Sequence, residues 1–261
     1  MRGWRNIQNI THPFQFVINN AMIKGESFTF KPIGYLKSCY PDKFGIPRQS
    51  GLVPKAISEL ELRADLQPEF SLQGLEGYSH IWLQFVFHLN SSARFHAKVH
   101  PPRLEGKAVG LFATRSPHRP NPIGLSLVEL LGIKNNKLIL AGADLADGTP
   151  ILDLKPYLPH LESKTTALGG WTDDIYKTEI TVDFTPMALE ILTNWMAKLA
   201  RPELQEVIID VLKQDPRPLV YRGLEGLDSP YRNKHAFRLY DGDIHFEFTE
   251  KFQVSVFDIR F

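Results

Sequence analysis

The sequence predicts a mainly β protein, in which a closed or sandwiched sheet comes first and a smaller α+β domain follows. In the first part, short strand-like segments alternate with turns rich in glycine and proline, and no long helical pattern interrupts them. After residue 184, apolar residues recur at helical spacing in two successive segments. An Asp-Gly dipeptide between two alternating segments then signals a hairpin. We therefore divide the chain into an N-terminal extension (1–28), a β domain (29–183) and an α+β domain (184–261).

Strand character recurs along the whole β domain. The segments that show it are 30–36, 78–89, 107–114, 125–133, 137–141 and 151–157. Segment 78–89 is aromatic and apolar, so we expect a strand that is buried on both faces. Asn135 and Asn136 separate two of the strands, and such a pair is typical of a tight hairpin turn.

The α+β domain is expected to begin with two amphipathic helices. Thr185 is a good N-cap and Pro186 a good first residue for the first helix. The second helix is expected to begin near Pro202. Asp241 and Gly242 then form the expected hairpin turn. The strands predicted after the helices are 237–240, 244–248 and 253–261.

Composition limits where this protein works and what it binds. It has 261 residues, of which 43% are apolar, as in a globular protein with a sizeable core. No apolar run approaches the roughly 18 residues that cross a bilayer, and no apolar block follows Met1 as in a secretory signal. The single cysteine, Cys39, excludes an intramolecular disulfide and a cage of thiolates around a metal. We expect a cytoplasmic protein without membrane or metal partners.

Several common catalytic motifs are missing from the sequence. It has no glycine-rich dinucleotide fingerprint, no P-loop, no HExxH and no GxSxG. These absences argue against a Rossmann dinucleotide domain, a P-loop NTPase, a zinc protease and an α/β-hydrolase. His96 and His100 have an i, i+4 spacing, but they lie in a basic loop without a close carboxylate, which disfavours a metal site.

Segment 112–124 is the most informative stretch of the chain. It reads FATRSPHRPNPIG. Three prolines and a glycine forbid both a helix and a central strand, and they hold the polar side chains at fixed positions. A stiff loop of this kind suits a binding or catalytic site. The alternative is a structural turn that happens to carry polar side chains.

Two further segments are candidates for the same site. Segment 44–51 reads FGIPRQSG and combines a proline-fixed backbone with a cation and an amide, and segment 144–150, DLADGTP, has two carboxylates around a tight turn. Residues 91–121 also carry six Lys or Arg against one acid, although the net charge of the chain is only +1. A positive face of this kind suits a polyanion, and a solvated basic loop is the alternative.

These segments carry a resemblance to a known family. The chain resembles the TrmO-type tRNA methyltransferases, also called TsaA-like, over about residues 29–261. The matching stretches are 44–52, 77–87, 99–104, 112–130 and 144–157, with 215–218 and 240–241 near the carboxy-terminal end. The pairing of FATRSP and RPNPIG with DLxDGTP is highly specific to this family.

The resemblance implies a non-Rossmann β-barrel methyltransferase that works as a homodimer, with S-adenosylmethionine bound near the subunit interface. It implies methylation of N6 in N6-threonylcarbamoyladenosine at position 37 of tRNA, so the expected partner is the tRNA anticodon stem-loop. The cofactor contacts carried over from the family are Pro47, Arg48, Gln49, His88, Leu89, Arg115, Leu125, Asp144, Leu145, Ala146 and Asp147. The chain departs from the family pattern at His118, Leu89 and Ala146, where an aromatic residue, Gln and Val are frequent.

Further residues are candidates on the substrate side. Arg119, Asn121 and Arg103 are expected to bind the substrate, because arginine matches a carboxylate and the prolines hold the first two in place. The general base is not identified; the catalytic candidates are His80, Asp147 and Asn121. Cations expected to meet RNA phosphates lie in 91–119 and at Arg217, Arg222, Arg232, Lys234 and Arg238.

Two alternative functions come from other classes. One is a regulatory module that binds S-adenosylmethionine without catalysis, which the dense polar loops also fit. The other is a hydrolase of a small phosphorylated or acylated substrate that uses His118 and Asp147, and the absence of a nucleophile motif disfavours it.

Overall fold

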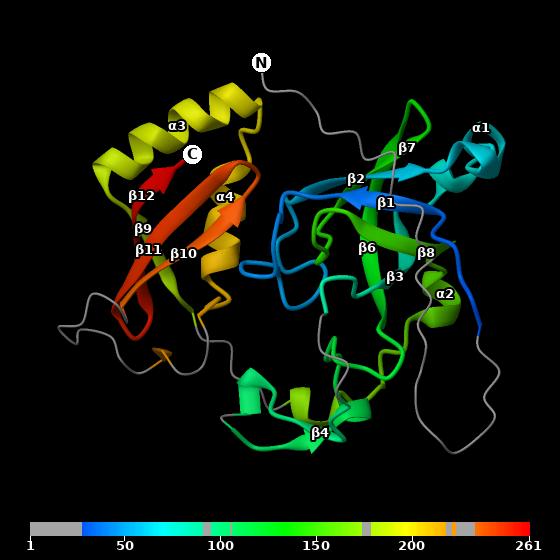
Figure 1. Ribbon diagram of the computed structural model, residues 1–261, viewed down its shortest axis with the longest axis horizontal. Helices are drawn as coiled ribbons and strands as arrows, with labels where there is room; N and C mark the ends of the chain where they lie inside the picture. The colour runs from blue at the N-terminus through cyan, green and yellow to red at the C-terminus, as the bar shows by residue number, and fades with distance from the viewer. Residues whose placement is uncertain (1–27, 91–94, 105, 174–178, 218–220, 223–232) are drawn as a thin grey trace.

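The computed structural model describes residues 28–261 except 91–94, 105, 174–178, 218–220 and 223–232. Almost all of the expected N-terminal extension therefore lies outside the described residues. Two sheets organise the rest of the chain (Figure 1). One closes into a barrel, and the other is an open four-stranded sheet. The mainly β prediction is confirmed.

The barrel consists of six strands that pair antiparallel throughout. The strand order is β1-β2-β7-β6-β3-β8, and β8 closes on β1. The bounds are β1 Gly34–Lys37, β2 Ile57–Leu62, β3 His80–Val86, β6 Ile123–Lys134, β7 Lys137–Ala141 and β8 Thr149–Pro156. Two short helices lie in its connections: α1 (Pro68–Ser71) between β2 and β3, and α2 (Pro159–Glu162) after β8. Asn135 and Asn136 both take left-handed φ values of 50° and 60°, as the expected β6–β7 hairpin turn requires.

Strand β3 is buried on one face only, which corrects the expectation of burial on both. Ile81 and Leu83 point into the barrel core and are fully buried. Trp82, on the opposite face, is half-buried, and its indole Nε1 donates a hydrogen bond of 3.0 Å to Glu162. Burial therefore alternates along β3, because this sheet has a packed interior and a partly covered exterior.

The expected strand over 107–114 is wrong for most of its length. Only Val109–Gly110 is extended, as β5, and it pairs with β4 (Lys98–Val99) in a separate two-stranded ribbon. Leu111–Ala113 forms a single 3₁₀ turn. Its buried Leu111 anchors the start of segment 112–124, which is called the proline-rich loop below. The ribbon lies away from the barrel (Figure 1).

The second sheet has the order β10-β11-β12-β9 and is covered by two helices. The bounds are β9 Thr181–Phe184, α3 Pro186–Leu199, α4 Leu204–Leu212, β10 Lys234–Leu239, β11 Gly242–Glu250 and β12 Gln253–Arg260. Thr185 caps α3 as expected, because its side-chain oxygen accepts a hydrogen bond from the Ala188 N–H at 3.2 Å. Strand β9 pairs parallel with β12, so the second sheet begins at Thr181, ahead of the boundary expected at residue 184.

The expected hairpin of the second domain is present, but its turn is shifted by one residue. Leu239 pairs with Gly242, so Tyr240 and Asp241 make the turn, and Tyr240 takes the left-handed φ of 51°. Gly242 is required for a different reason: a Cβ at this position would come within 2.7 Å of the Trp195 ring. The glycine thus serves close packing of α3 on the sheet rather than the turn itself.

The β1–β2 connection joins the two domains. Cys39, Tyr40 and Val53 from this connection are buried in one apolar core with Trp195 of α3 and Phe237 of β10. Burial raises the pKa of the Cys39 thiol to about 12, so the thiol stays protonated near neutral pH. Among the described helices, none combines the length and the apolar character that crossing a membrane requires.

Candidate active site

The three candidate segments meet at one end of the barrel. Strands β1, β3 and β7 finish at this end, and β2, β6 and β8 begin there. The three connections that span it are 38–56, 87–122 and 142–148. These connections contain segment 44–51 and most of segments 112–124 and 144–150, whose last two residues begin β6 and β8. In Figure 1 the 38–56 connection passes on the side of the barrel that faces the second domain.

Backbone hydrogen bonds fix the acidic turn, residues 144–148, against the first connection. The Gly51 N–H donates to the Gly142 carbonyl at 2.8 Å, and the Gly142 N–H donates to the Ala56 carbonyl at 3.0 Å. The Gly148 N–H donates to the Leu36 carbonyl at 2.8 Å. The side chain of Leu145 is buried in the barrel core, so this cofactor candidate offers a ligand only its main chain. The turn is therefore rigidly placed relative to β1 and β2.

The polar candidates at this end of the barrel, Gln49, His88, Arg115, Asp144 and Asp147, are called the cofactor cluster below. Asp144 is its most strongly desolvated carboxylate. Burial raises its pKa above the usual range for Asp, although a hydrogen bond from the Ser126 hydroxyl at 2.6 Å favours the ionised form. The Arg115 guanidinium and the Ser50 backbone act in the same direction as Ser126. Arg115 also donates to the side-chain oxygen of Gln49, which links the proline-rich loop to the first connection. Residues of the first connection, the proline-rich loop and β6 thus surround the Asp144 carboxylate.

Asp147 and His88 form a second pair beside the first. The exposed Asp147 carboxylate accepts a hydrogen bond from the Ser38 N–H at 2.8 Å, while the Asp147 N–H donates to the Tyr40 carbonyl at 2.7 Å. Burial lowers the pKa of His88, and the nearby Asp147 charge opposes this only in part. His88 is therefore neutral near pH 7. The cofactor candidates His88 and Leu89 follow shortly after the end of β3, at this end of the barrel.

The Arg48 loop is held by the second domain. The Arg48 guanidinium donates to the Asp215 carbonyl at 2.9 Å, and the Arg48 N–H donates to the Gln214 side-chain oxygen at 3.3 Å. Pro47, one residue earlier, is buried. The segment after α4 therefore supports the loop that carries three expected cofactor contacts.

Two of the substrate candidates, Arg119 and Asn121, lie on the proline-rich loop with Arg115. The Arg119 guanidinium donates to the Thr114 carbonyl at 3.0 Å and lies 5.5 Å from the centre of the Phe112 ring. These contacts hold Arg119 against its own loop. Asn121 is exposed, and its carbonyl accepts a hydrogen bond from the Ile123 N–H at 2.7 Å. The side chain of Arg103 lies outside the described structure.

His80 does not join the cluster. It begins β3, whereas His88 follows the other end of the strand, and six residues of strand span about 20 Å. Its ring Nδ1 lies 2.9 Å from the Ser79 hydroxyl, and its ring contacts Tyr157 edge-on. Of the three catalytic candidates, Asp147 and Asn121 lie at the loop-bearing end of the barrel and His80 lies at the opposite end.

Some residues that support the site were missed in the sequence. Ser126 faces Asp144, Ser38 holds Asp147, and Gln214 holds Arg48. Ser126 lies inside a predicted strand, where an alternating polar residue at an inward position was the available signal. Nothing local in the sequence marks the other two, because their partners lie 109 and 166 residues away.

Arg217, expected to meet a phosphate, is instead part of the second domain's interior. Its side chain is 3% exposed, and it makes two hydrogen bonds to the Asp215 carboxylate, at 2.8 and 3.0 Å. Its guanidinium stacks 3.4 Å from the centre of the Phe248 ring. Arg222 also pairs with Asp215, and Arg238 forms an exposed ion pair with Asp243. Arg232 lies outside the described residues. Within the described chain, no group of three His, Cys, Asp or Glu residues is arranged to hold a metal.

Comparison with known proteins decides the family. The model of the tRNA-methyltransferase O N-terminal domain matches residues 35–163, and that of the TrmO C-terminal domain matches residues 177–261. The chain belongs to the TrmO family. Both family domains are present, in the order and over nearly the same residues as the barrel and the second sheet.

Individual TrmO relatives match along nearly their whole length. A protein of Escherichia coli K12 named tRNA (adenine(37)-N6)-methyltransferase is 40% identical over 240 residues, which are 90% of this chain and 99% of that one. A Pseudomonas aeruginosa protein named putative S-adenosylmethionine-dependent methyltransferase RcsF is 39% identical over 229 residues, covering 87% and 96%. The crystal structure of TrmO from Pseudomonas aeruginosa superposes with a TM-score of 0.74 at 34% identity, covering 90% and 99%.

The TrmO cofactor is S-adenosylmethionine, and the residues of this cluster fit it. The cofactor carries positive charge at its sulfur and ammonium groups, hydroxyls on its ribose and a flat apolar adenine. The desolvated carboxylate of Asp144 is a partner for a cation or a hydroxyl, since a positive neighbour offsets the burial of its charge. Leu125 and Leu89 are 52% and 37% exposed, and they offer apolar surface beside these polar groups.

Proposed function

We propose that this protein transfers a methyl group from S-adenosylmethionine to N6 of adenine 37 in tRNA, and that this adenine carries the N6-threonylcarbamoyl group. The match of both TrmO domains to this chain is the observation that carries the proposal. The name of the Escherichia coli relative, which covers nearly the whole chain, supports the position and the atom. The threonylcarbamoyl group rests on the family resemblance alone.

The cofactor occupies the end of the barrel in this proposal. When bound, S-adenosylmethionine supplies a methyl group on a positively charged sulfur. Asp144, kept in place by the Ser126 hydroxyl, binds a cationic or hydroxyl group of the cofactor. Gln49 and Arg115 close the site from the first connection and from the proline-rich loop. Because these groups come from three rigid segments, they hold the cofactor in one orientation.

The acceptor nitrogen needs a neighbouring group that takes up its proton. The N6 lone pair is delocalised into the purine and the carbamoyl group, so N6 is a weak nucleophile. Asp147 is the catalytic candidate with a carboxylate in the cluster, and the Ser38 N–H fixes its orientation. Asn121 carries an amide, which orients a substrate but does not accept a proton at neutral pH. Asp147 therefore serves as the proton acceptor in this proposal.

Substrate binding is assigned to the proline-rich loop. Arg119 lies on the same stiff loop as Arg115, which reaches the cofactor residues. A guanidinium matches the carboxylate of a threonyl group or a phosphate of the RNA. Arg103 and Asn121 complete this side of the site. The tRNA anticodon loop, whose bases are unstacked, presents adenine 37 to it.

The proposed assembly is a homodimer in the cytoplasm, where tRNA is modified. The outer face of β6 exposes three apolar side chains, Ile123, Leu125 and Leu131, to 41%, 52% and 51%. A second copy of the barrel that covered this face would bury apolar surface next to the cofactor residues. Analytical ultracentrifugation measures the mass of the wild-type protein and of Leu131→Asp. If the dimer forms through this face, the wild type sediments as a dimer and the variant as a monomer.

Nucleoside mass spectrometry tests the proposed reaction directly. The purified protein is incubated with S-adenosylmethionine and tRNA that either carries or lacks the threonylcarbamoyl group. A gain of one methyl in the modified nucleoside supports the proposal, and a gain in unmodified adenosine contradicts the threonylcarbamoyl part alone. Cofactor binding without methylation of either tRNA would favour a regulatory module.

A further inference from the structure

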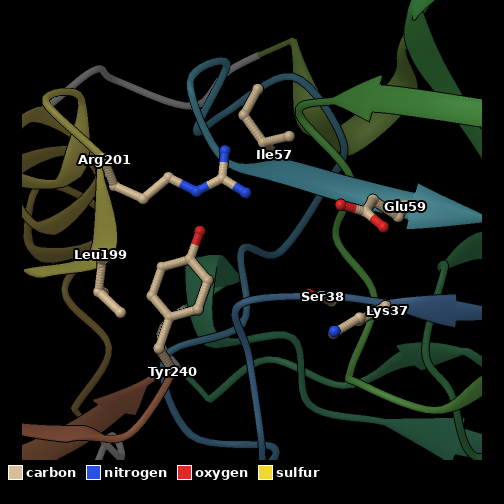
Figure 2. A pocket seen from close by; sticks show the side chains of 7 residues that line it. All are labelled: Lys37, Ser38, Ile57, Glu59, Leu199, Arg201 and Tyr240. Atoms are coloured by element: carbon tan, nitrogen blue, oxygen red, sulfur yellow. The ribbon is translucent and has the colours of Figure 1, made fainter. Parts of the chain in front are cut away.

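A pocket lies between the barrel and the second domain, outside the cofactor cluster. Its volume is about 240 Å³, and it opens between the outer face of β1 and β2 and the tips of α3 and the β10–β11 hairpin. The residues that line it are Lys37, Ser38, Ile57, Glu59, Leu199, Arg201 and Tyr240. Figure 2 shows polar side chains from both domains directed into this space.

Arg201 is the cation that the second domain contributes. It directly follows Ala200, which ends α3 in the left-handed conformation with φ of 54°. Figure 2 shows its guanidinium extended from α3 toward β2, across the pocket from Glu59. One terminal nitrogen lies 3.5 Å from a Glu203 oxygen, and the side chain is 33% exposed. A guanidinium has five N–H donors, so this single long contact leaves donors for a ligand.

Tyr240 places a hydroxyl beside that guanidinium. The Tyr240 N–H donates to the Cys39 carbonyl at 2.8 Å, which fixes the hairpin turn against the first connection. The ring stands in the pocket with its oxygen toward Arg201 (Figure 2). Burial raises the pKa of Tyr240 to about 12, so the hydroxyl keeps its proton near neutral pH and can donate it to an acceptor.

Lys37 and Glu59 supply the charges on the barrel side. They are directly paired across β1 and β2, on the outer face of the barrel. Neighbouring side chains of opposite charge at paired positions attract each other. The carboxylates of Glu59 and Glu203 offset the charges of Lys37 and Arg201, so the pocket attracts a ligand through its N–H and O–H donors and not through excess charge. A pocket in which a guanidinium and a hydroxyl both donate hydrogen bonds is suited to an oxyanion.

The pocket is joined to the active site through one residue. Ser38 lines the pocket, and its N–H donates to the Asp147 carboxylate at 2.8 Å. The next residue of the acidic turn, Gly148, is hydrogen-bonded to Leu36 of β1. The pocket therefore adjoins the acidic turn that carries Asp147. When the base of a nucleotide lies beside Asp147, a substituent of that base or the phosphate of a neighbouring nucleotide can enter the pocket.

We infer that the pocket between the domains binds an oxyanion of the RNA substrate, held by Arg201 and Tyr240. The oxyanion is either a backbone phosphate or the carboxylate of a modified base, because both are planar or tetrahedral oxygen groups that guanidinium and hydroxyl donors recognise. This inference rests on the proposed tRNA methyltransferase function. It adds a binding contact that no part of the cofactor cluster provides.

Binding of two tRNAs to full-length variants tests the inference. The affinity of the wild-type protein, Arg201→Gln and Tyr240→Phe is measured for tRNA with and without the threonylcarbamoyl group, at several salt concentrations. Lys198→Gln is the matched control, because Lys198 lies on α3 in an exposed ion pair with Asp241 and does not line the pocket. Arg201→Lys tests whether charge alone restores binding.

Each source of the oxyanion predicts its own result. If the pocket holds a phosphate, Arg201→Gln weakens both tRNAs roughly tenfold and lowers the salt slope by about 0.7. If it holds the base carboxylate, only the tRNA with the threonylcarbamoyl group loses affinity. In both cases Tyr240→Phe also weakens tRNA binding, and neither variant changes the affinity for S-adenosylmethionine.

Two outcomes would overturn the inference. One is unchanged affinity for both tRNAs in Arg201→Gln and Tyr240→Phe, and the other is an equal loss in the Lys198→Gln control. Thermal unfolding of each variant separates lost binding from lost folding, and Tyr240→Phe keeps the ring that packs in the turn. If the wild-type protein methylates neither tRNA, the proposed function itself fails, which is a different result from an unaffected pocket variant.

Discussion

The guanidinium of Arg48 donates a hydrogen bond of 2.9 Å to the carbonyl of Asp215, 167 residues further along the chain. Arg48 belongs to the loop expected to contact the cofactor, and Asp215 follows α4 in the second domain. Gln214 adds a second contact to the Arg48 main chain at 3.3 Å. The second domain therefore fixes one wall of the proposed cofactor site.

Gln214→Ala is expected to weaken S-adenosylmethionine binding without unfolding the protein. The change removes the side-chain acceptor of the Arg48 N–H and leaves the carbonyl of Asp215 in place. Loss of one hydrogen bond of this type corresponds to about 1 kcal/mol, or roughly a fivefold weaker Kd. Calorimetric titration measures it, with Gln253→Ala on β12 as the control. Equal affinities in the two variants would show that the loop does not need this support.

Asp144→Asn is expected to raise stability and lower cofactor affinity. Burial raises the pKa of Asp144, so the ionised carboxylate costs folding free energy above that pKa. The folded state then holds a proton that the unfolded state has already lost, and stability falls as pH rises through the interval between the two pKa values. The amide keeps an acceptor for the Ser126 hydroxyl but removes the charge.

The pH dependence of stability shows whether the gain in Asp144→Asn comes from removing a buried charge or from a change in packing. The thermal midpoint of Asp144→Asn should exceed that of the wild type at pH 8, and the difference should shrink toward pH 4 as the wild-type carboxyl takes up its proton. Affinity for S-adenosylmethionine should fall about tenfold at pH 8, as for a lost contact to a charged group. A difference in midpoint that is the same at both pH values would contradict the assigned role of burial.

Local sequence patterns were enough to mark the segments that meet at one end of the barrel. The proline-rich loop, Asp144 and Asp147 are recognisable from the residues next to them in the sequence. The fold brings these segments together at one end of the barrel. His80 lies away from these segments, because a side chain six residues before the end of β3 lies about 20 Å from that end. Side-chain type alone does not say at which end of a strand a histidine will lie.

Features that depend on distant partners were not predictable. Arg217 has the composition of a phosphate contact, but Asp215 and Phe248 enclose it. Strand β2 was missed because Glu59 and Glu61 lower its strand propensity, and one of its two inward-facing residues is the polar Ser58, beside Leu60. Pairing with β1 and β7 overrides that local preference.

Asp147→Asn is expected to slow methyl transfer while the fold is kept. The amide oxygen still accepts the Ser38 N–H, so the turn stays in place, but the side chain no longer takes up a proton. Loss of a general base lowers kcat by about 10² to 10⁴. Single-turnover rates between pH 5 and pH 9 measure the effect. Wild-type rates in the variant would assign the proton to solvent rather than to Asp147.

Arg119→Ala is expected to abolish tRNA methylation and to spare cofactor binding. Arg119 contacts Thr114 and Phe112 of its own loop, whereas Arg115 makes the contact with Gln49. Methylation by Arg119→Ala and Arg119→Lys is compared with their affinity for S-adenosylmethionine. Partial recovery of methylation in the lysine variant indicates a charge contact with RNA. Equal loss of cofactor affinity would instead show that Arg119 shapes the loop for the cofactor.

Arg217→Ala is expected to destabilise the second domain and, through it, the cofactor site. The change leaves the Asp215 carboxylate without its two hydrogen bonds from Arg217 and exposes the Phe248 ring. Breaking a buried ion pair in this way costs about 3 kcal/mol or more. Arg217→Lys should recover little, because lysine lacks the planar fork that both pairs with a carboxylate and stacks on a ring.

Urea unfolding compares these variants with Arg260→Ala, which removes an exposed ion pair with Asp258 and should cost under about 1 kcal/mol. Asp215 also carries the carbonyl that accepts from Arg48, so a loosened Asp215 should weaken S-adenosylmethionine binding as well. A destabilised Arg217→Ala protein with full cofactor affinity would separate the two effects. It would then place the support of the cofactor loop in the Gln214 side chain and the main chain of residue 215 alone.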